Sequence, residues 1–520
     1  MSKEKKPGKL KKIIRNTVIV GVVLFILLII FAPDEEEYSD TSDYDSAESI
    51  DANRNEVLGE YFDTSVVRER GVHLKGDGTD KVTVLIYMNG SDLESDGGEA
   101  TEDISEIIAA GTSENVNIII QTMGTKKWSP ELGISSERTE RYRVIDGGIE
   151  LIDDSLGQLD CTKASTLSDF IKWGASEYPA DRYILHFWNH GAGPVYGFGY
   201  DQWQGEDASL TIDEMKTALS DGGVYFDFIG MDCCIMSCME VCMALYDYCD
   251  YAILSEEFES GLGWSYTGWV SALNENSSID TITLAKIAID DNVEANEEEY
   301  DGDSACLALI DESVMKVLYA AWTDFAYANE DSLLGENYSQ RVKRSKRAHP
   351  KTLKSRSEWD YGYYDFFSNF DDDALLSDYY ITDIMAVAQN VTSKESDALS
   401  AAVSGCIVYS KATSDDKYMT GLSVTLPYGD SEFYDELASV FNKCGFDEEY
   451  VTWLGNFVTA EGSSEFYDYD EDWGDEWNGW DEYDEYYDDY DWEYWELLED
   501  DEYWEDDEYW GWDDGCCCCY

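Results

Sequence analysis

The sequence predicts an α/β protein with a doubly wound, mostly parallel sheet covered by helices on both faces. Between residues 82 and 254, apolar runs of strand length alternate with segments of helical length, and this alternation is typical of a parallel sheet. Two of the apolar runs end abruptly in reactive residues, His190 and Cys234. A parallel sheet gathers such residues in the crevice at the carboxyl ends of its strands. The two side chains can therefore meet if their strands are neighbours.

The expected elements follow one another in a regular order. Strands are expected at residues 82–88, 116–122, 182–188, 225–230 and 251–254, with a hairpin formed by 141–145 and 149–153. Helices are expected between them at residues 104–110, 167–178, 210–220 and 234–248. Residues 280–400 are expected to be more helical, and strands at 404–409 and 421–427 and a helix at 447–458 complete the fold.

A basic flank and an apolar run open the chain. Residues 1–15 carry seven Lys or Arg and one Glu. The apolar run 17–32, extended by Ile13 and Ile14, approaches the roughly 20 residues that a membrane helix needs. Because a basic flank stays cytoplasmic, the sequence predicts a single-pass anchor in the cell membrane over residues 13–32, with the folded part of the chain extracellular. A cleaved signal peptide is the alternative, although no cleavage site of small residues follows the run.

Charge and composition divide the rest of the chain. Residues 461–520 carry 27 Asp or Glu and no Lys or Arg, so carboxylate repulsion should keep this aromatic segment disordered. The sequence therefore predicts a flank and anchor (1–33), an acidic linker (34–75), one large domain (76–460) and a low-complexity tail (461–520). The tail could bind cations, basic proteins or the cell wall, or only aid solubility. The net charge of −76 excludes nucleic acid as a partner, since a phosphate-binding surface must be basic.

Cys234 and His190 are the candidate catalytic residues. A thiol attacks only as a thiolate, and the expected place of Cys234 in the first turn of a helix would favour ionisation. His190 could complete the ion pair or protonate a leaving amine. Because Gly191 has no side chain, a substrate carbonyl could approach its N–H, which would form an oxyanion hole with the N–H of Cys234. Cys233 is the competing nucleophile, and His186, inside a strand, is expected to be a core residue.

The residues around these two positions resemble the clostripain family of cysteine peptidases. The family pattern is a strand that ends in His-Gly, and then a strand that ends in Asp-Ala-Cys followed by Leu or Ile and Met. Here it reads Asn189-His190-Gly191 and Asp232-Cys233-Cys234-Ile235-Met236, with Cys233 in place of Ala. Weaker matches, among them Asp92-Leu93-Glu94 and Tyr364-Asp365-Phe366, extend the resemblance over roughly residues 80–460. The resemblance implies a caspase-like fold and a cysteine endopeptidase that acts on proteins or peptides.

The resemblance also implies cleavage after Arg or Lys, with an acidic pocket for the side chain on the amino side of the cut (P1). Asp232 is the matching carboxylate, and a helix N-cap is its alternative role. Glu256 is expected to add a second acidic wall, with Glu257 and Glu259 as the alternatives. Trp264 is expected to wall the pocket or to lie in the core. No metal site or cofactor is predicted; calcium dependence occurs in the family, but no EF-hand spacing is present.

Two other functions compete with this prediction. A catalytically inactive relative could act as a surface binding protein, and Cys233 in place of the family's Ala is its only support. The glycines at 191, 193, 197 and 199 could form a nucleotide-binding loop. That interpretation fails on context, because no helix is expected directly after them and no acidic residue is placed to bind a ribose.

Overall fold

The structure, a computed structural model, describes residues 47–205, 208–299, 305–334, 381–414, 419–427 and 431–459. They all lie in the first of two compact units, Met1–Ser463; the second unit is Ser464–Tyr520. The expected membrane anchor (13–32) and the tail (461–520) lie outside the described residues. Within the described ranges, no helix is both long and apolar enough to cross a membrane.

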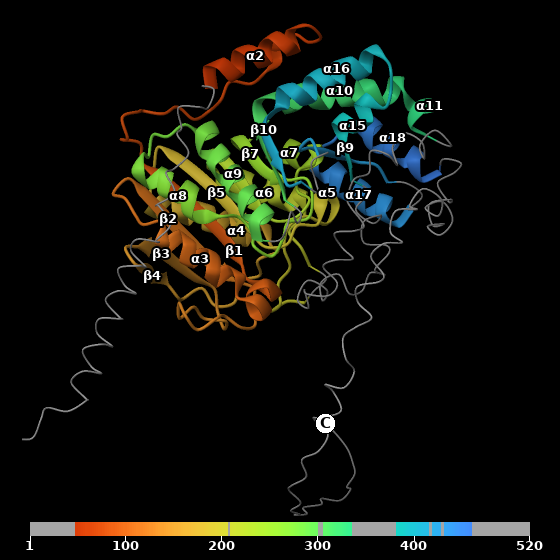
Figure 1. The fold of residues 1–520 in the computed structure, drawn as a ribbon. Helices are drawn as coiled ribbons and strands as arrows, with labels where there is room; N and C mark the ends of the chain where they lie inside the picture. The colour runs from red at the N-terminus through yellow and green to blue at the C-terminus, as the bar shows by residue number, and fades with distance from the viewer. Residues whose placement is uncertain are drawn as a thin grey trace, which may run out of the picture. The chain divides into compact units, whose positions relative to one another are not determined.

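A mixed nine-stranded sheet lies at the centre of the described part of the chain (Figure 1). The strand order is β10-β8-β7-β6-β5-β1-β2-β3-β4. The inner five strands pair in parallel: β7 (Cys249–Ser255), β6 (Phe226–Asp232), β5 (Arg182–Trp188), β1 (Val82–Asn89) and β2 (Val116–Met123). The outer four pair antiparallel: β8 (Cys306–Asp311), β10 (Ile407–Ala412), β3 (Glu140–Ile145) and β4 (Gly148–Asp153).

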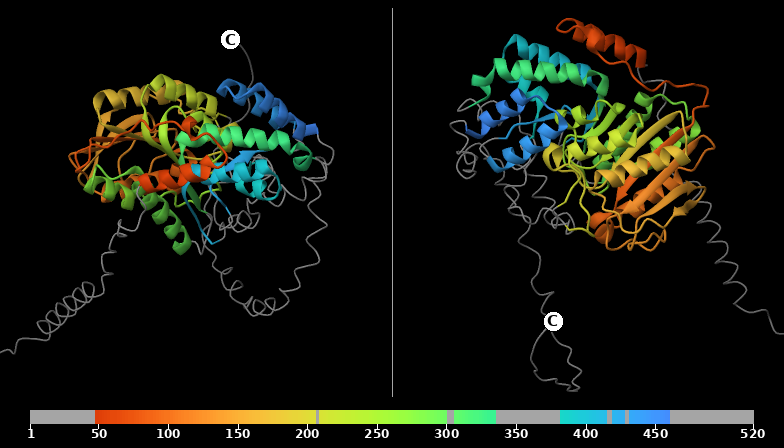
Figure 2. Two further views of the ribbon diagram at one scale, coloured as in Figure 1. Left: turned by 90° about the horizontal axis from the view of Figure 1, so that it is seen from above. Right: turned by 180° about the vertical axis from the view of Figure 1, so that it is seen from behind.

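Helices cover both faces of this sheet (Figures 1 and 2). Both faces need a cover because the side chains of β1 are apolar on each side, and successive residues of a strand point to opposite faces. Val84 and Ile86 join Ile104 in one buried cluster, whereas Leu85 packs under Gly174 on the other side. One face carries α3 (Glu99–Ala109), α8 (Tyr266–Glu275) and α9 (Thr281–Glu299), and the other carries α4 (Ala164–Glu177) and α6 (Ile212–Gly222). The predicted α/β class and mostly parallel sheet are thereby confirmed.

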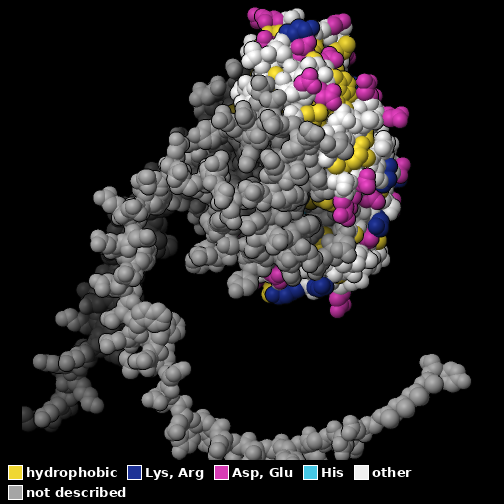
Figure 3. All heavy atoms as spheres, turned by 90° about the vertical axis from the view of Figure 1, so that its right-hand side faces the viewer, with side chains coloured by type: hydrophobic (Ala, Val, Ile, Leu, Met, Phe, Trp, Pro, Cys, Tyr) yellow, Lys and Arg dark blue, Asp and Glu magenta, His cyan; other side chains and the backbone are white. Residues whose placement is uncertain are grey.

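Further helices follow the sheet strands in the second half of the chain. They are α10 (Met315–Ala328), α11 (Glu330–Leu333), α15 (Ile384–Gln389), α16 (Lys394–Cys406), α17 (Ser431–Cys444) and α18 (Glu448–Thr459), with a small sheet of β9 (Ile381–Asp383) and β11 (Ser423–Thr425). Figure 3 shows Asp and Glu side chains spread over the described part of one face, with few Lys or Arg. The excess of acidic residues is therefore also visible on the folded domain.

Part of the predicted acidic linker is packed onto this domain. Residues Ala47–Gly59 form helix α2, and its Leu58 is fully buried against Gly405 of α16. Arg54 and Arg70 both contact the buried carboxylate of Asp311 at the end of β8, with Arg70 at 2.7 Å. The described part of the linker is therefore held by apolar burial and by ion pairs, which its acidic composition did not suggest.

The helix predicted at 234–248 begins later than expected. Strand β6 continues to Asp232, and helix α7 spans only Met239–Leu245. Between them, Ile235 has a positive φ of 51°, which a branched side chain rarely adopts and which no α-helix allows. The backbone N–H of Ser237 donates instead to Ser255 O at 2.7 Å. The expectation that a helix N-terminus lowers the pKa of Cys234 is therefore wrong.

Candidate active site

The carboxyl ends of three adjacent strands form the candidate site. Strand β5 lies between β1 and β6, and Trp188 of β5 pairs with Asp232 of β6. His190 and Cys234 each follow two residues after this pair. Strands β2, β3 and β4 lie on one side of β1, whereas β5 and the strands after it lie on the other side. The strand order therefore reverses between β1 and β5, and ligands of open α/β sheets bind at such a switch point. The predicted proximity of the two strand ends is confirmed.

Gly191 lies directly against the backbone of Cys234. A Cβ atom at Gly191 would stand 2.1 Å from the carbonyl oxygen of Cys234 and 3.0 Å from its nitrogen. Only glycine allows this approach, since the clashing atoms belong to the backbone. The two residues expected to form the oxyanion hole are therefore neighbours in space.

The two cysteines of this turn have different surroundings. The Sγ atom of Cys234 accepts a hydrogen bond from the backbone N–H of Glu259 at 3.2 Å, and the residue is 5% exposed. Burial raises the pKa of the Cys233 thiol well above its usual value, and the negative charge of Glu259 adds to the shift. Cys233 is thus held as a neutral thiol, which weakens it as a competing nucleophile.

His190 is paired with a carboxylate, Asp92, that the sequence analysis matched to the family but did not count among the site residues. Its Nε2 lies 2.9 Å from Oδ1 of Asp92, and both side chains are almost fully buried. Burial alone would raise the pKa of Asp92, but the attraction of His190 and hydrogen bonds from His190, Tyr200 and Ser91 lower it to about 2. Asp92 is therefore ionised at neutral pH. The imidazole also stacks on the ring of Tyr200, with 5.8 Å between centroids.

Asp232 lies in a buried, strongly acidic environment. Its Oδ2 accepts the backbone N–H of Trp264 at 3.0 Å and the hydroxyl of Tyr266 at 2.7 Å. Burial raises the pKa of Asp232 to about 6, although these two hydrogen bonds oppose the shift. The expected role as a helix N-cap does not apply, because α7 begins at Met239 and its N-cap is Cys238.

Among the three glutamates considered for a second acidic wall, Glu259 lies near both Asp232 and Cys234. Glu257 borders the same turn through its carbonyl oxygen, which accepts the N–H of Ile235. Oε1 of Glu259 accepts the indole N–H of Trp264 at 3.2 Å, and Oε2 of Glu259 has no hydrogen-bond partner among the described residues. Burial and the charge of Asp232 raise the pKa of Glu259 well above its usual value. Glu256 instead binds Gly421 N and Ser423 Oγ with its two oxygens. The structure thus separates Glu256 from the other predicted pocket residues.

Trp264 and His186 pack together beneath these carboxylates. Trp264 is 1% exposed, and its ring lies edge-on to that of His186 with 4.8 Å between centroids. The ring lies in the core, which is one of the two positions that the sequence left open, while its backbone and indole N–H groups donate to Asp232 and Glu259. The prediction that His186 is a core residue is confirmed by its complete burial.

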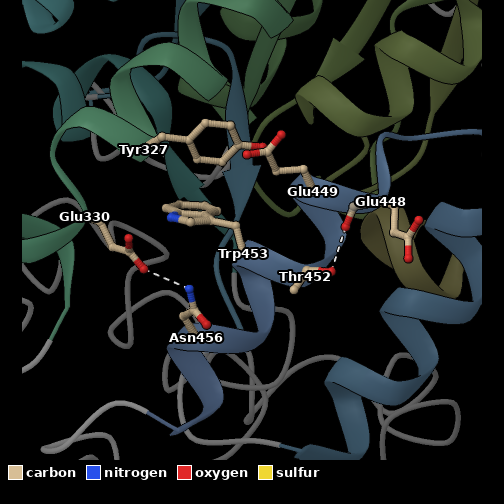
Figure 4. A pocket seen from close by; sticks show the side chains of 7 residues that line it. All are labelled: Tyr327, Glu330, Glu448, Glu449, Thr452, Trp453 and Asn456. Carbon is tan, nitrogen blue, oxygen red and sulfur yellow. Dashed lines mark hydrogen bonds between the residues drawn. The ribbon is translucent and has the colours of Figure 1, made fainter.

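A cavity of about 580 Å³ lies elsewhere, between α10, α11 and α18 (Figure 4). Its lining combines aromatic rings and carboxylates: Tyr327, Glu330, Glu448, Glu449, Thr452, Trp453 and Asn456. None of these residues carries a thiol or an imidazole, so this cavity is not the site of nucleophilic chemistry.

Sequence reasoning missed three residues near the site: Asp92, Asp103 and Tyr266. Asp92 could have been found, because it follows β1 at the same sheet edge as His190 and Cys234. Asp103 and Tyr266 lie within α3 and α8, where no pattern along the chain distinguishes them. Their approach to β5 and β6 depends on helix packing over the sheet.

A mostly parallel α/β sheet that brings a thiol and an imidazole to adjoining strand ends has the architecture of a cysteine peptidase. The clostripain family model matches residues 86–510, and the chain belongs to this family. It is therefore a cysteine protease, a hydrolase of peptide bonds.

Two solved structures share the fold. A secreted cysteine protease from Bacteroides thetaiotaomicron, in complex with an irreversible peptide inhibitor, is 17% identical with a TM-score of 0.51, and the match covers 71% of this chain and 100% of that one. Another structure of a secreted cysteine protease from the same organism is 14% identical with a TM-score of 0.52, and covers 72% and 98%. No curated protein matches the chain.

Proposed function

We propose that this chain is a cell-surface endopeptidase in which Cys234 is the nucleophile and His190 the acid–base partner. The contact between Gly191 and the backbone of Cys234 is the observation that carries the proposal. It brings the two strand ends together, so that one substrate carbonyl can meet both residues.

The proposed reaction proceeds through a thioester. The Cys234 thiolate attacks the scissile carbonyl carbon, and the N–H groups of Gly191 and Cys234 stabilise the negative charge on its oxygen. The C–N bond breaks as His190 protonates the departing amine. Water, deprotonated by His190, then hydrolyses the thioester and restores the thiol. No metal or cofactor takes part in this scheme.

Asp92 is proposed as the positioning residue for His190. Since Asp92 is ionised, the Nε2 atom of His190 carries a hydrogen and donates it to Oδ1. Nδ1 is then the nitrogen that exchanges a proton with thiol and substrate. The carboxylate also stabilises the imidazolium that forms during the reaction.

Arg or Lys is proposed as the preferred P1 residue. Asp232 and Glu259 offer buried carboxylates next to the turn that holds Cys234. A cationic side chain would stabilise the ionised forms of these carboxyl groups, whereas a neutral one would leave them unpaired. Discrimination between the two should therefore be large.

Labelling with an arginyl chloromethyl ketone tests the nucleophile. We expect Cys234 to be alkylated in the wild-type chain, and Cys234→Ala and His190→Ala to lose several orders of magnitude in kcat/KM. Cys233→Ala is the matched control and should retain activity. Labelling of Cys233, or full activity in Cys234→Ala, would contradict the proposal.

A peptide library profiled at P1 tests the specificity. We expect Arg and Lys to dominate, and Asp232→Asn to lose this preference while still cleaving neutral substrates slowly. A preference for acidic or large apolar P1 residues would contradict the proposed pocket.

A further inference from the structure

Three buried side chains form a continuous hydrogen-bonded chain beneath the proposed P1 pocket. The hydroxyl of Tyr266 lies 2.7 Å from Oδ2 of Asp232 and 2.7 Å from Nε2 of His186. Tyr266 and His186 are fully buried, and Asp232 is 5% exposed. Helix α8 supplies the tyrosine, and strands β5 and β6 supply the other two residues.

The hydrogens of this chain can be assigned from the surroundings of His186. Burial lowers the pKa of His186 to about 3, so one ring nitrogen carries the only hydrogen at neutral pH. Nδ1 has no hydrogen-bond partner among the described residues, and it lies over Gly230, where a Cβ atom would stand only 2.7 Å away. A buried N–H without an acceptor is more costly than a bare nitrogen, so the hydrogen belongs on Nε2.

This assignment fixes the direction of the other two hydrogen bonds. His186 donates from Nε2 to the Tyr266 oxygen, so the single hydrogen of that hydroxyl points to Asp232. The N–H of Trp264 donates to the same carboxylate oxygen. The arrangement therefore favours an ionised Asp232, which can only accept hydrogen bonds.

The other titratable groups around Asp232 favour its neutral form instead. A Cβ atom at Gly263 would lie 3.1 Å from Oδ2 of Asp232 and 3.4 Å from Oδ2 of Asp103, so the two carboxylates share one small space. Asp103 is itself held by the indole N–H of Trp188 at 2.6 Å. The titratable groups that face Asp232 from the packed elements are Asp103 and Glu106 on α3, Tyr266 on α8, and Cys233 and Glu259 on the loops after β6 and β7.

We infer that His186 and Tyr266 are positioning residues that hold Asp232 ionised, and that they thereby set the pH range in which the pocket accepts a basic P1 side chain. The inference rests on the proposed function and goes beyond it, because it assigns the control of specificity to two residues that do not touch the substrate. Burial and the neighbouring carboxylates favour the neutral acid, and the donated hydrogen bonds offset them.

The experiment compares two peptide substrates that differ only at P1, one with Arg and one with its neutral isostere citrulline, between pH 5 and pH 9. In the wild-type chain, the Arg preference in kcat/KM should fall as the pH drops through about 6, where Asp232 takes up its proton. In Tyr266→Phe, the same transition should move up by about one to two pH units, since one hydrogen bond to the charged form is lost. The preference at pH 7 should then fall about two- to ten-fold and recover at pH 9, with citrulline cleavage unchanged.

Tyr450→Phe is the matched control, because it also removes a buried tyrosine hydroxyl that donates to a carboxylate, Glu240, at 2.9 Å. It should lower the melting temperature without moving the pH profile. A second variant, His186→Leu, should shift the transition in the same direction as Tyr266→Phe and keeps the test decisive if that variant does not fold. The concentration of active enzyme in each sample is measured with the arginyl chloromethyl ketone, and each rate is divided by it.

The possible failures can be told apart. A wild-type chain that does not distinguish Arg from citrulline at any pH would contradict the proposed specificity, and this inference with it. A wild-type chain with a clear Arg preference, combined with an unshifted transition in folded Tyr266→Phe or His186→Leu, would overturn the inference alone.

Discussion

Nε2 of His190 lies 2.9 Å from Oδ1 of Asp92, and the two residues follow neighbouring strands, β5 and β1. The residue before Asp92, Ser91, has a positive φ of 41°. Uncommon backbone angles of this kind persist where the surrounding structure demands them, and they cluster at functional sites. The turn after β1 therefore places a carboxylate within hydrogen-bond distance of the imidazole.

Asp92→Ala should lower kcat/KM on the order of 10²-fold, because His190 loses the group that orients its ring and stabilises its charged form. Asp92→Asn keeps the shape of the side chain but not its charge, so its kcat/KM should lie between those of the wild type and Asp92→Ala. The measurement is steady-state kinetics over pH 5–9. Asp80→Asn is the control, since Asp80 is also a buried carboxylate that accepts backbone N–H groups, from Lys75 and Gly76. Wild-type rates in Asp92→Ala would show that this pair does not contribute to catalysis.

Gly191→Ala should abolish most activity, because the added methyl group meets the Cys234 carbonyl oxygen and must push the turn apart. Loss of one oxyanion-hole donor alone costs about 10²- to 10³-fold in kcat, so the fall should be at least this large. The melting temperature should also decrease. Gly148→Ala is the control, since nothing lies within 4 Å of a Cβ atom there. Equal kinetics in the two variants would contradict the close approach.

Glu240→Gln should stabilise the protein increasingly as the pH rises from about 4.5 to 7. Burial raises the pKa of Glu240 to about 7, although hydrogen bonds from Thr425 and Tyr450 oppose the shift. The folded state thus keeps a proton that the unfolded state releases in this window. The free energy of unfolding of the wild type therefore falls as the pH rises, by an amount on the order of 3 kcal/mol. Melting curves of the wild type and of Glu240→Gln at several pH values measure this change in the free energy of unfolding.

The matched control for this prediction is Glu102→Gln, because Glu102 is exposed on α3 and its charge costs little in either state. The free energy of unfolding of Glu102→Gln should change with pH in the same way as that of the wild type. If Glu240→Gln also ran parallel to the wild type, Glu240 would be ionised in the folded protein.

Asp311→Asn should release the segment that carries α2. Arg54 and Arg70 both depend on this carboxylate, which is 1% exposed, and removal of one partner from a buried ion pair costs about 3–5 kcal/mol. Limited proteolysis should then cut within residues 47–75 first, at a lower temperature than in the wild type. Glu150→Gln, which removes an exposed pair with Arg143, should change neither property. Unchanged proteolysis of Asp311→Asn would mean that the burial of Leu58 and the contacts of Arg68, Gly71 and Val72 with Asp250 are enough to hold the segment.

Truncation after residue 460 should leave activity and melting temperature nearly unchanged. The 27 carboxylates of residues 461–520 have no basic residue beside them in the sequence, so we expect this segment not to pack on the core at neutral pH. Binding to cations, basic proteins or cell wall should change instead. Loss of turnover on truncation would show that the tail supports the domain.

Protease treatment of intact cells tests the predicted orientation. The basic flank predicts an anchor over residues 13–32 with the catalytic domain outside, so the domain should be removed from the surface. Protection of the domain in intact cells, but not in lysed cells, would reverse the orientation.

The sequence by itself determined the family and most strands of the sheet. It did not predict β8 (Cys306–Asp311), which lies where residues 280–400 were expected to be more helical. Strands such as Val82–Asn89 and Arg182–Trp188 are buried along their whole length or nearly so, so their apolar runs mark them within one residue. His190 and Cys234 were identified because each follows such a run, and the end of a run is a local property of the sequence.

Only the tertiary structure decided the surroundings of these two residues. The contacts of Ser237 with Ser255 and of Ile235 with Glu257 replace the expected start of a helix after Cys234. Tyr266 reaches Asp232 and His186 from a helix about 30 to 80 residues away in the chain. Hydrogen bonds of this kind depend on how a helix packs across the sheet, and packing over such distances leaves no periodic pattern in the sequence. The candidate nucleophile can therefore be found from the sequence alone, whereas the hydrogen bonds around Asp232 come from residues that only folding brings together.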